Sequence, residues 1–253
     1  MSDAPPATSA ASGPNDHRAQ AVRLGGLGAV LAGVVFLGTI AYTFGFLFAR
    51  GLSFEMLNEP ARLLPWVHAN TVAYVGLWWI YTLHFLCLLP APRGLAMIVG
   101  DERATVRMAT VAGIAGAVVG MIAAQVNAAT APPLAAASVA TAPALLPSLW
   151  LQSELAGGLG LQLRLLSDLL VAVWIATTGL TLAHRPGWRI LGLVQLGVSA
   201  LVVVVYVGKP FDWFDLEPTL GFVLALVYLW MGVRLCGVRD AECAVRDSGM
   251  RDA

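Results

Sequence analysis

Charge is scarce in this chain. Only 12% of its 253 residues are Asp, Glu, Lys or Arg, whereas about 25% is usual in soluble domains. A water-soluble globule of this size would need far more charge to cover its surface. The formal net charge is zero, so no excess of positive charge attracts nucleic acid. We therefore expect neither a soluble enzyme surface nor a nucleic-acid partner.

Cysteines and catalytic motifs are also scarce. The chain has 3 cysteines, which excludes a disulfide-rich secreted module. It contains no Gly-x-x-x-x-Gly-Lys-Ser/Thr, Gly-x-Ser-x-Gly, His-Glu-x-x-His or Cys-x-x-Cys pattern, the patterns typical of phosphate-binding loops, serine hydrolases, zinc proteases and thiol redox sites. The sequence therefore predicts no catalytic residue and no metal site.

Apolar residues are abundant instead. They make up 58% of the chain, and the mean hydropathy is +0.76. A bilayer core about 30 Å thick requires about 20 apolar residues of helix. Because lipid cannot satisfy free backbone groups, spanning segments must be helical. The sequence therefore predicts an all-α fold, a polytopic bundle of six transmembrane helices. These are Leu27–Phe48, Val67–Leu89, Thr105–Ala129, Leu159–Ala183, Ile190–Val207 and Pro218–Leu235.

The basic residues indicate how the bundle faces. Eleven arginines fall on the side that holds the N-terminus, and three basic residues, Arg50, Arg62 and Lys209, fall on the other. Cytoplasmic loops carry the excess of Lys and Arg, so both termini are predicted to be cytoplasmic (N-in/C-in). A single lysine beside fourteen arginines, with many Ala and Gly, is typical of a high-GC bacterium. The predicted location is the bacterial cytoplasmic (inner) membrane.

Three regions follow from this topology. Residues 1–24 lack an apolar run and are predicted to be a disordered cytoplasmic tail. Residues 25–235 form the six-helix transmembrane domain, and residues 236–253 form a charged cytoplasmic tail. The segment Thr130–Gly158 is predicted to be a long outer loop. It is either a plain connection or a lid over an outer cavity, in which Ser148 would cap a short helix at the membrane interface.

Two of the predicted spans carry a distinctive stripe of residues along one helical face. The third span has small residues at Ala109, Gly113, Gly116, Gly120 and Ala124. Such a stripe allows another helix to approach closely, so the third span is predicted to be central and the most buried.

The second span carries the stripe Asn70, Tyr74, Leu77, Tyr81 and His84, spaced by four, three, four and three residues. At 100° per residue these side chains share one face. The stripe is either a hydrogen-bonded track for a proton or polar ligand, or a packing face whose polar groups bond to neighbouring helices.

The fourth span holds an acid and a base one helical turn apart, Arg164 and Asp168. Charges inside a membrane are costly and normally find partners. The predicted outer ends of the second and third spans hold three more polar residues. If the three helices are neighbours, an outer-leaflet polar pocket forms, whose candidate residues are His68, Asn70, Asn127, Arg164 and Asp168. The other interpretation is an ordinary structural pair.

No cofactor is expected. His68 and His84 are sixteen residues apart and therefore point to opposite faces of a helix. A haem held between His84 and His184 is the remaining pair that the geometry allows.

The run Leu166-Ser167-Asp168-Leu169 through Trp174, Gly179 and Leu180, followed by Arg185-Pro186-Gly187-Trp188-Arg189-Ile190-Leu191-Gly192, resembles a family of six-helix bacterial integral membrane proteins of unknown function. The start of the first span, Leu31-Ala32-Gly33, and the long third loop fit this resemblance. The family brings no known activity, so the resemblance implies the architecture and no catalytic residue.

Three functions remain open at this stage. The first is a membrane-embedded binding or assembly module, accessory to another complex and without catalysis. The second is a small transporter or channel that uses the outer polar pocket, and the third is a membrane enzyme that acts on a lipid-like substrate. The expected partners are the lipid bilayer and either a second copy of the chain or another membrane protein.

Overall fold

The computed structural model describes residues 14–57, 59–208 and 217–238, and every regular element within these ranges is a helix. The helices are α1 (Pro14–Ala41), α2 (Phe54–Leu57), α3 (Pro60–Ala69), α4 (Thr71–Leu88), α5 (Ala91–Val99), α6 (Ala104–Ala140), α7 (Leu146–Ala183), α8 (Arg189–Gly208) and α9 (Glu217–Cys236). A π-helical turn (Tyr42–Leu47) and two 3₁₀ turns (Phe48–Arg50 and Pro143–Leu145) complete the set.

Five helical segments are long and apolar enough to cross a membrane. They are Asp16–Arg50, Thr71–Val99, Ala104–Ala140, Pro143–Ala183 and Arg189–Tyr206. In α9 the apolar part that the structure describes, Leu220–Cys236, is shorter. The chain is therefore an all-helical protein whose apolar helices are compatible with a membrane.

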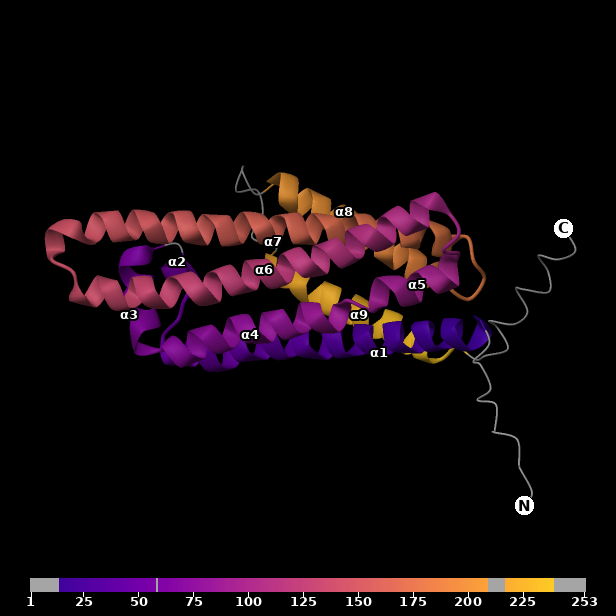
Figure 1. Cartoon of the computed structure of the whole chain (residues 1–253), viewed down its shortest axis with the longest axis horizontal. Helices are drawn as coiled ribbons and strands as arrows, with labels where there is room; N and C mark the ends of the chain where they lie inside the picture. The colour runs from indigo at the N-terminus through magenta and orange to yellow at the C-terminus, as the bar shows by residue number, and fades with distance from the viewer. Residues whose placement is uncertain (1–13, 58, 209–216, 239–253) are drawn as a thin grey trace, which may run out of the picture.

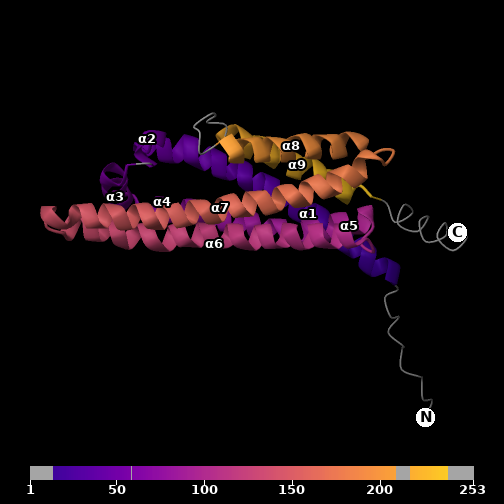
Figure 2. The same cartoon turned by 90° about the horizontal axis from the view of Figure 1, so that it is seen from above.

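The long helices of the described chain pack as a closed ring. Each contacts the next in the order α1, α4, α6, α7, α8 and α9, and α9 returns to α1. Figure 1 shows the long α6–α7 hairpin beside the α1–α4 pair, and Figure 2 shows α8 and α9 on the opposite side of the molecule from α6. The short helix α5 lies against α1, α6, α7 and α9. The helices predicted as the second and fourth spans, α4 and α7, therefore flank α6.

The long outer loop predicted for Thr130–Gly158 is wrong. Helix α6 continues to Ala140 and α7 begins at Leu146. The prolines that suggested a loop are tolerated, because Pro147 occupies the first turn of α7, where no amide donor is needed, and Pro132 and Pro133 lie inside an alanine-rich stretch of α6. With 37 residues, α6 is about 55 Å long, and the hairpin tip extends past the other helices (Figure 1).

The predicted N-terminal tail is shorter than expected, because α1 begins at Pro14. Residues 14–24 are helical since they have partners. Val22 is buried, a Cβ on Gly25 would meet Gly94 at 2.6 Å, and Arg18 donates a hydrogen bond to Met97. The rest of this tail, residues 1–13, and residues 239–253 of the predicted C-terminal tail lie outside the described residues.

The small-residue stripe of the third span is buried as predicted, but its helix is not central. All five stripe residues are buried on α6. A Cβ on Gly113 would lie 2.8 Å from Trp174, and one on Gly120 would lie 2.4 Å from Phe85. The opposite face of α6 is open, with Met108 74% exposed. Helix α6 therefore lies at one side of the ring (Figure 2).

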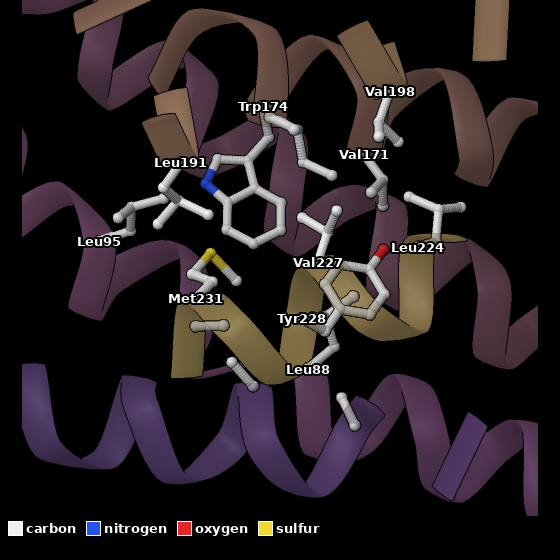
Figure 3. Packing of buried hydrophobic residues seen from close by; sticks show 14 of the residues in the cluster. Leu88, Leu95, Val171, Trp174, Leu191, Val198, Leu224, Val227, Tyr228 and Met231 are labelled. Atoms are coloured by element: carbon white, nitrogen blue, oxygen red, sulfur yellow. The ribbon is translucent and has the colours of Figure 1, made fainter. Parts of the chain in front are cut away.

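A large apolar cluster fills the ring beside α5. Trp174, Leu95, Leu191 and Met231 are fully buried and meet there from four helices (Figure 3). We call this cluster, together with Leu88, the apolar core. Its side chains fill the space between the helices at the end of the bundle where α5 lies.

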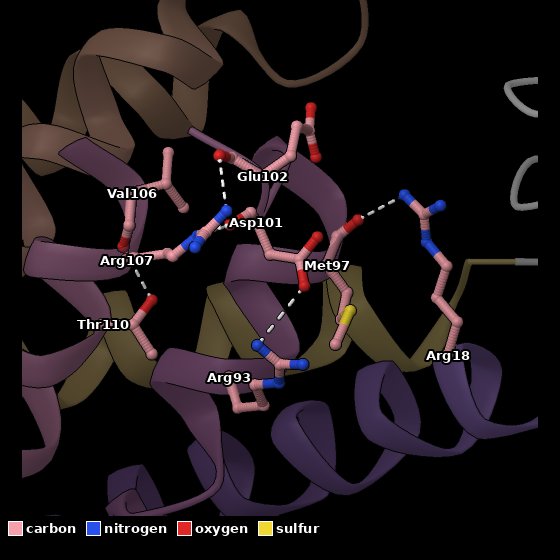
Figure 4. A network of polar contacts seen from close by, with 8 residues as sticks. All are labelled: Arg18, Arg93, Met97, Asp101, Glu102, Val106, Arg107 and Thr110. Atoms are coloured by element: carbon pink, nitrogen blue, oxygen red, sulfur yellow. Dashed lines mark hydrogen bonds and ion pairs between the residues drawn. The ribbon is translucent and has the colours of Figure 1, made fainter. Parts of the chain in front are cut away.

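Arginines gather at that same end. Arg18 of α1 donates to the carbonyl of Met97 over 2.7 Å, and Arg185 donates to the carbonyls of Ile98 and Val99. These carbonyls are the last of α5, where basic side chains stabilise a helix. Figure 4 shows Arg18, and also the pair of Arg93 with Asp101, whose charged groups are 3.3 Å apart. We call this the arginine end.

Candidate functional site

Arg164 and Asp168 of α7 lie at the interior of the ring. The Arg164 Nε atom is 4.0 Å from the Asp168 Oδ2 atom, and the side chains are 25% and 28% exposed. The Arg164 guanidinium also lies 4.9 Å from the centre of the Tyr81 ring. Tyr81 belongs to α4, so this cation–π contact joins α7 to α4 beside α6. Arg164 is thereby held between an acid on its own helix and an aromatic face on another.

His84 lies one turn further along α4 and is buried. Its Nδ1 atom is 2.9 Å from the carbonyl oxygen of Ala32 on α1. A carbonyl only accepts hydrogen bonds, so Nδ1 carries the proton in this arrangement. The imidazole stacks on Phe36 with 4.5 Å between ring centres, and Tyr228 of α9 lies 5.8 Å away. Helices α1, α4 and α9 therefore meet at this histidine.

The charged pair also reaches helices α8 and α9. The carboxylate of Asp168 interacts electrostatically with the phenols of Tyr206 on α8 and Tyr228 on α9. Arg164 interacts in the same way with His84. We call the resulting group the polar centre. Its members are Tyr81, His84, Arg164, Asp168, Tyr206 and Tyr228.

The polar centre offers charge and hydrogen bonds. It contains one cation, one anion, three phenols and an imidazole from four helices. Within the described residues no three His, Cys, Asp or Glu side chains gather closely enough to hold a metal ion. These side chains can bind a polar group inside an apolar bundle.

The other residues predicted for the pocket lie elsewhere. His68 is exposed on α3, and Asn70, at the end of α3, donates to the carbonyl of Trp66 over 3.0 Å. Asn127 donates to the carbonyl of Ala123 and lies against Gly160, one turn from Arg164. The structure therefore brings Arg164 and Asp168 together with part of the second-span stripe, and it leaves His68 and Asn70 at the corner between α3 and α4.

The second-span stripe divides between two clusters. Tyr74 and Leu77 are buried in an apolar cluster near α3 with Leu64, and the centre of the Tyr74 ring is 5.9 Å from that of Trp78. Tyr81 and His84 belong to the polar centre. The stripe thus packs against neighbouring helices along its length, and only its last two polar members approach the charged pair.

The two histidines considered for haem have different surroundings. His84 is buried beside Phe36, whereas His184 is exposed at the end of α7, with its Nδ1 atom 2.8 Å from the carbonyl of Leu180. Each already has a backbone partner, and a cofactor-free protein remains our prediction.

Sequence reasoning missed Tyr206 and Tyr228. Their residue type is the signal that could have found them. The chain has 5 tyrosines, and all five lie in helices of the bundle. Tyr42, the fifth, donates its hydroxyl to the carbonyl of Ala73 on α4. A tyrosine inside an apolar span usually has a polar partner.

The depth of the polar centre follows from helix geometry. Asp168 lies fifteen residues before Ala183, the last residue of α7, which places it about 22 Å from that end. The apolar core around Trp174 lies between the polar centre and the arginine end. The apolar core therefore separates the centre from the arginine end.

Comparisons of this chain with family models, with curated proteins and with solved structures give no match. The functional argument therefore rests on the geometry of the polar centre.

Proposed function

We propose that this chain is a membrane-embedded binding module without catalytic activity, built on six transmembrane helices with both termini in the cytoplasm of a bacterial cell. The arginine end supports this orientation. It gathers basic residues from α1, α5, α9 and the turn after α7, and basic residues mark the cytoplasmic side. The predicted sixth span corresponds to α9.

The observation that carries the function is the contact of Arg164 with Tyr81 inside the ring. A charge in an apolar bundle is costly and is normally retained for a ligand, an ion path or a partner. Arg164 contacts Tyr81 of α4 and pairs with Asp168 over 4.0 Å, and both charged side chains keep about a quarter of their surface exposed. A binding site for a polar group requires charged side chains that are fixed in place and that a ligand can still reach.

The apolar core favours binding over transport. Trp174, Leu191 and Met231 are fully buried between the polar centre and the arginine end, so a channel would need to rearrange this packed core. A polar centre that an apolar core separates from the arginine end suits a module that holds a ligand or presents it to a partner. The bilayer, a second copy of the chain and another membrane protein are the partners that this role implies.

A direct test is native mass spectrometry of the full-length protein after purification in a mild detergent. We expect a bound small molecule or lipid on the wild type, and at least a fivefold lower occupancy on Arg164→Gln, by analogy with the loss caused by removing one charged anchor. Arg62→Gln is the matched control, because Arg62 forms an exposed ion pair with Glu59 over 3.2 Å. Equal occupancy on all three proteins, or no bound molecule on any, contradicts the proposal.

A further inference from the structure

Three phenylalanines gather on the surface where the apolar segment Asp16–Arg50 ends. The ring centres of Phe44, Phe48 and Phe54 lie 5.0 to 5.7 Å apart. Phe54 begins the short helix α2, and Leu57 ends it on the same side of the helical turn. Phe44, Phe54 and Leu57 are 43%, 45% and 44% exposed. We call these three rings and Leu57 the aromatic patch.

The fold fixes the segment that carries the patch. Gly51 turns the chain with a φ of +87°, a conformation that glycine adopts without strain, and α2 thereby returns against the preceding rings. Leu47 and Leu52 are buried in the apolar cluster near α3, and the indole Nε1 of Trp66 donates to the carbonyl of Arg50 over 2.8 Å. The patch is therefore the exposed face of an anchored turn, and not part of a free loop.

The patch lies at the depth where two membrane-compatible segments end. The segment Asp16–Arg50 ends beside it, and the segment Thr71–Val99 begins at the same level. A contact ties the two ends together, because the Tyr42 hydroxyl donates to the carbonyl of Ala73 over 3.0 Å. Figure 2 shows α2 at the far end of the segment that begins with α1. This is the depth of the boundary between acyl chains and lipid head groups.

The charges around the patch match a lipid surface. The guanidinium of Arg50 lies 4.3 Å from the centre of the Phe46 ring, next to the patch. A cation beside aromatic rings complements lipid phosphates that lie above an acyl layer. The acids nearby are directed to a base of their own, because Arg62 lies 3.9 Å from Glu55 and 3.2 Å from Glu59.

We infer that the aromatic patch is an interfacial membrane anchor, with Phe54 and Leu57 inserted among the first acyl carbons of the outer leaflet and Arg50 at the level of the lipid phosphates. The bilayer is the partner, because two of the three rings belong to the apolar segment Asp16–Arg50 itself and α2 extends the surface of that segment. The proposed topology names the leaflet, and the anchor requires no ligand at the polar centre.

Spin labels on the full-length protein measure the depth of α2 in vesicles of palmitoyl-oleoyl-phosphatidylcholine and palmitoyl-oleoyl-phosphatidylglycerol. In a cysteine-free background, Leu57→Cys and Glu55→Cys each carry one nitroxide. Power saturation compares its collisions with oxygen, which concentrates in lipid, and with a water-soluble nickel chelate. We expect the label at position 57 to lie about 5–10 Å below the phosphates and the label at position 55 to lie in water. Glu55 is the matched control, because it belongs to the same helical turn and its side chain is 82% exposed.

A serine substitution tests whether the rings hold α2 in the membrane. Phe54→Ser removes the ring that contacts both Phe44 and Phe48. It should raise the collision rate of the label at position 57 with the nickel chelate by about twofold or more, because a shallow insertion depends on its buried apolar area. Phe222→Ser is the control, because Phe222 is 47% exposed on α9, and it should leave this label unchanged.

Three outcomes would overturn the anchor. If both labels collide equally with the nickel chelate, α2 lies in water. If the label at position 57 is shielded from oxygen as well as from the chelate, protein covers the patch. If its protection disappears when the protein is diluted with lipid, the cover is a second copy of the chain. The binding test with Arg164→Gln is independent of all three, so the proposed function can stand where the anchor fails.

Discussion

Substitution of Gly120 tests how tightly α6 packs against α4. A Cβ added to Gly120 would lie 2.4 Å from Cζ of Phe85, whereas ordinary contact begins at 3.4 Å. The ring or the helix must therefore move by about 1 Å. The Phe85 ring is 7% exposed and lies 4.8 Å from the ring of His84, so it has little room. We expect Gly120→Ala to destabilise the protein by about 1–3 kcal/mol, the usual cost of overpacking.

The same change at Gly197 is the control for this experiment. Gly197 is exposed on α8 and has no neighbour within 4 Å of an added Cβ. Alanine there should be neutral or stabilise the helix by up to about 1 kcal/mol. Thermal unfolding of both variants in the same detergent measures the difference. If Gly120→Ala unfolds at the same temperature as Gly197→Ala, α6 and α4 are not in close contact and the ring order is wrong.

Three further predictions concern topology, packing and the charged pair. In a cysteine-free background, Ala142→Cys at the hairpin tip should react with an impermeant thiol reagent that is added outside the cell, and His184→Cys should not. The reverse labelling pattern contradicts the N-in/C-in topology. Ser167→Ala removes a buried hydrogen bond of 2.7 Å to the carbonyl of Gly116 and should cost about 0.6 kcal/mol in unfolding free energy. Thr177→Ala should cost less, because Thr177 is only half-buried and its hydrogen bond stays within α7. Asp168→Asn alone should destabilise the protein more than Asp168→Asn combined with Arg164→Gln, because the single change leaves the arginine charge uncompensated. A coupling below about 0.5 kcal/mol in this double-mutant cycle would show that the two side chains interact with solvent rather than with each other.

The spans were the part of the fold that hydropathy could predict. Helix α7 ends at Ala183, the residue where the fourth span was expected to end, and α6 begins at Ala104, one residue before the prediction. Hydropathy detects these helices because a run of apolar residues must be long enough to cross the membrane. It does not say how far a helix continues beyond the bilayer.

This limit explains the error at Thr130–Gly158. Four prolines and several polar residues in that segment resemble a loop, yet alanine has the highest helix propensity and occupies much of it. The partners of the segment are also invisible in the sequence, for example the buried Ala135, which packs in a cluster with residues near α3. Helix–helix contact thus overrides the local signals.

The candidate site was half visible in the sequence. Arg164 and Asp168 could be found because they are charges in an apolar span, and Tyr81 and His84 because they share a helical face. Their meeting could not be predicted, since it depends on α4 and α7 lying on either side of α6. His68 had the right chemistry and the right predicted depth, but α3 ends and α4 begins at the corner beside it.

The contact between Arg164 and Tyr81 is the basis of the binding site, and a double-mutant cycle measures it directly. We expect Arg164→Gln and Tyr81→Leu to be coupled by about 0.5–2 kcal/mol in unfolding free energy, the range of cation–π contacts that are partly or fully removed from water. Tyr81→Phe keeps the aromatic face, so in the background of this variant Arg164→Gln should cost as much as in the wild type. Additive effects of Arg164→Gln and Tyr81→Leu would contradict the account, because α7 and α4 would then not meet at a shared polar centre.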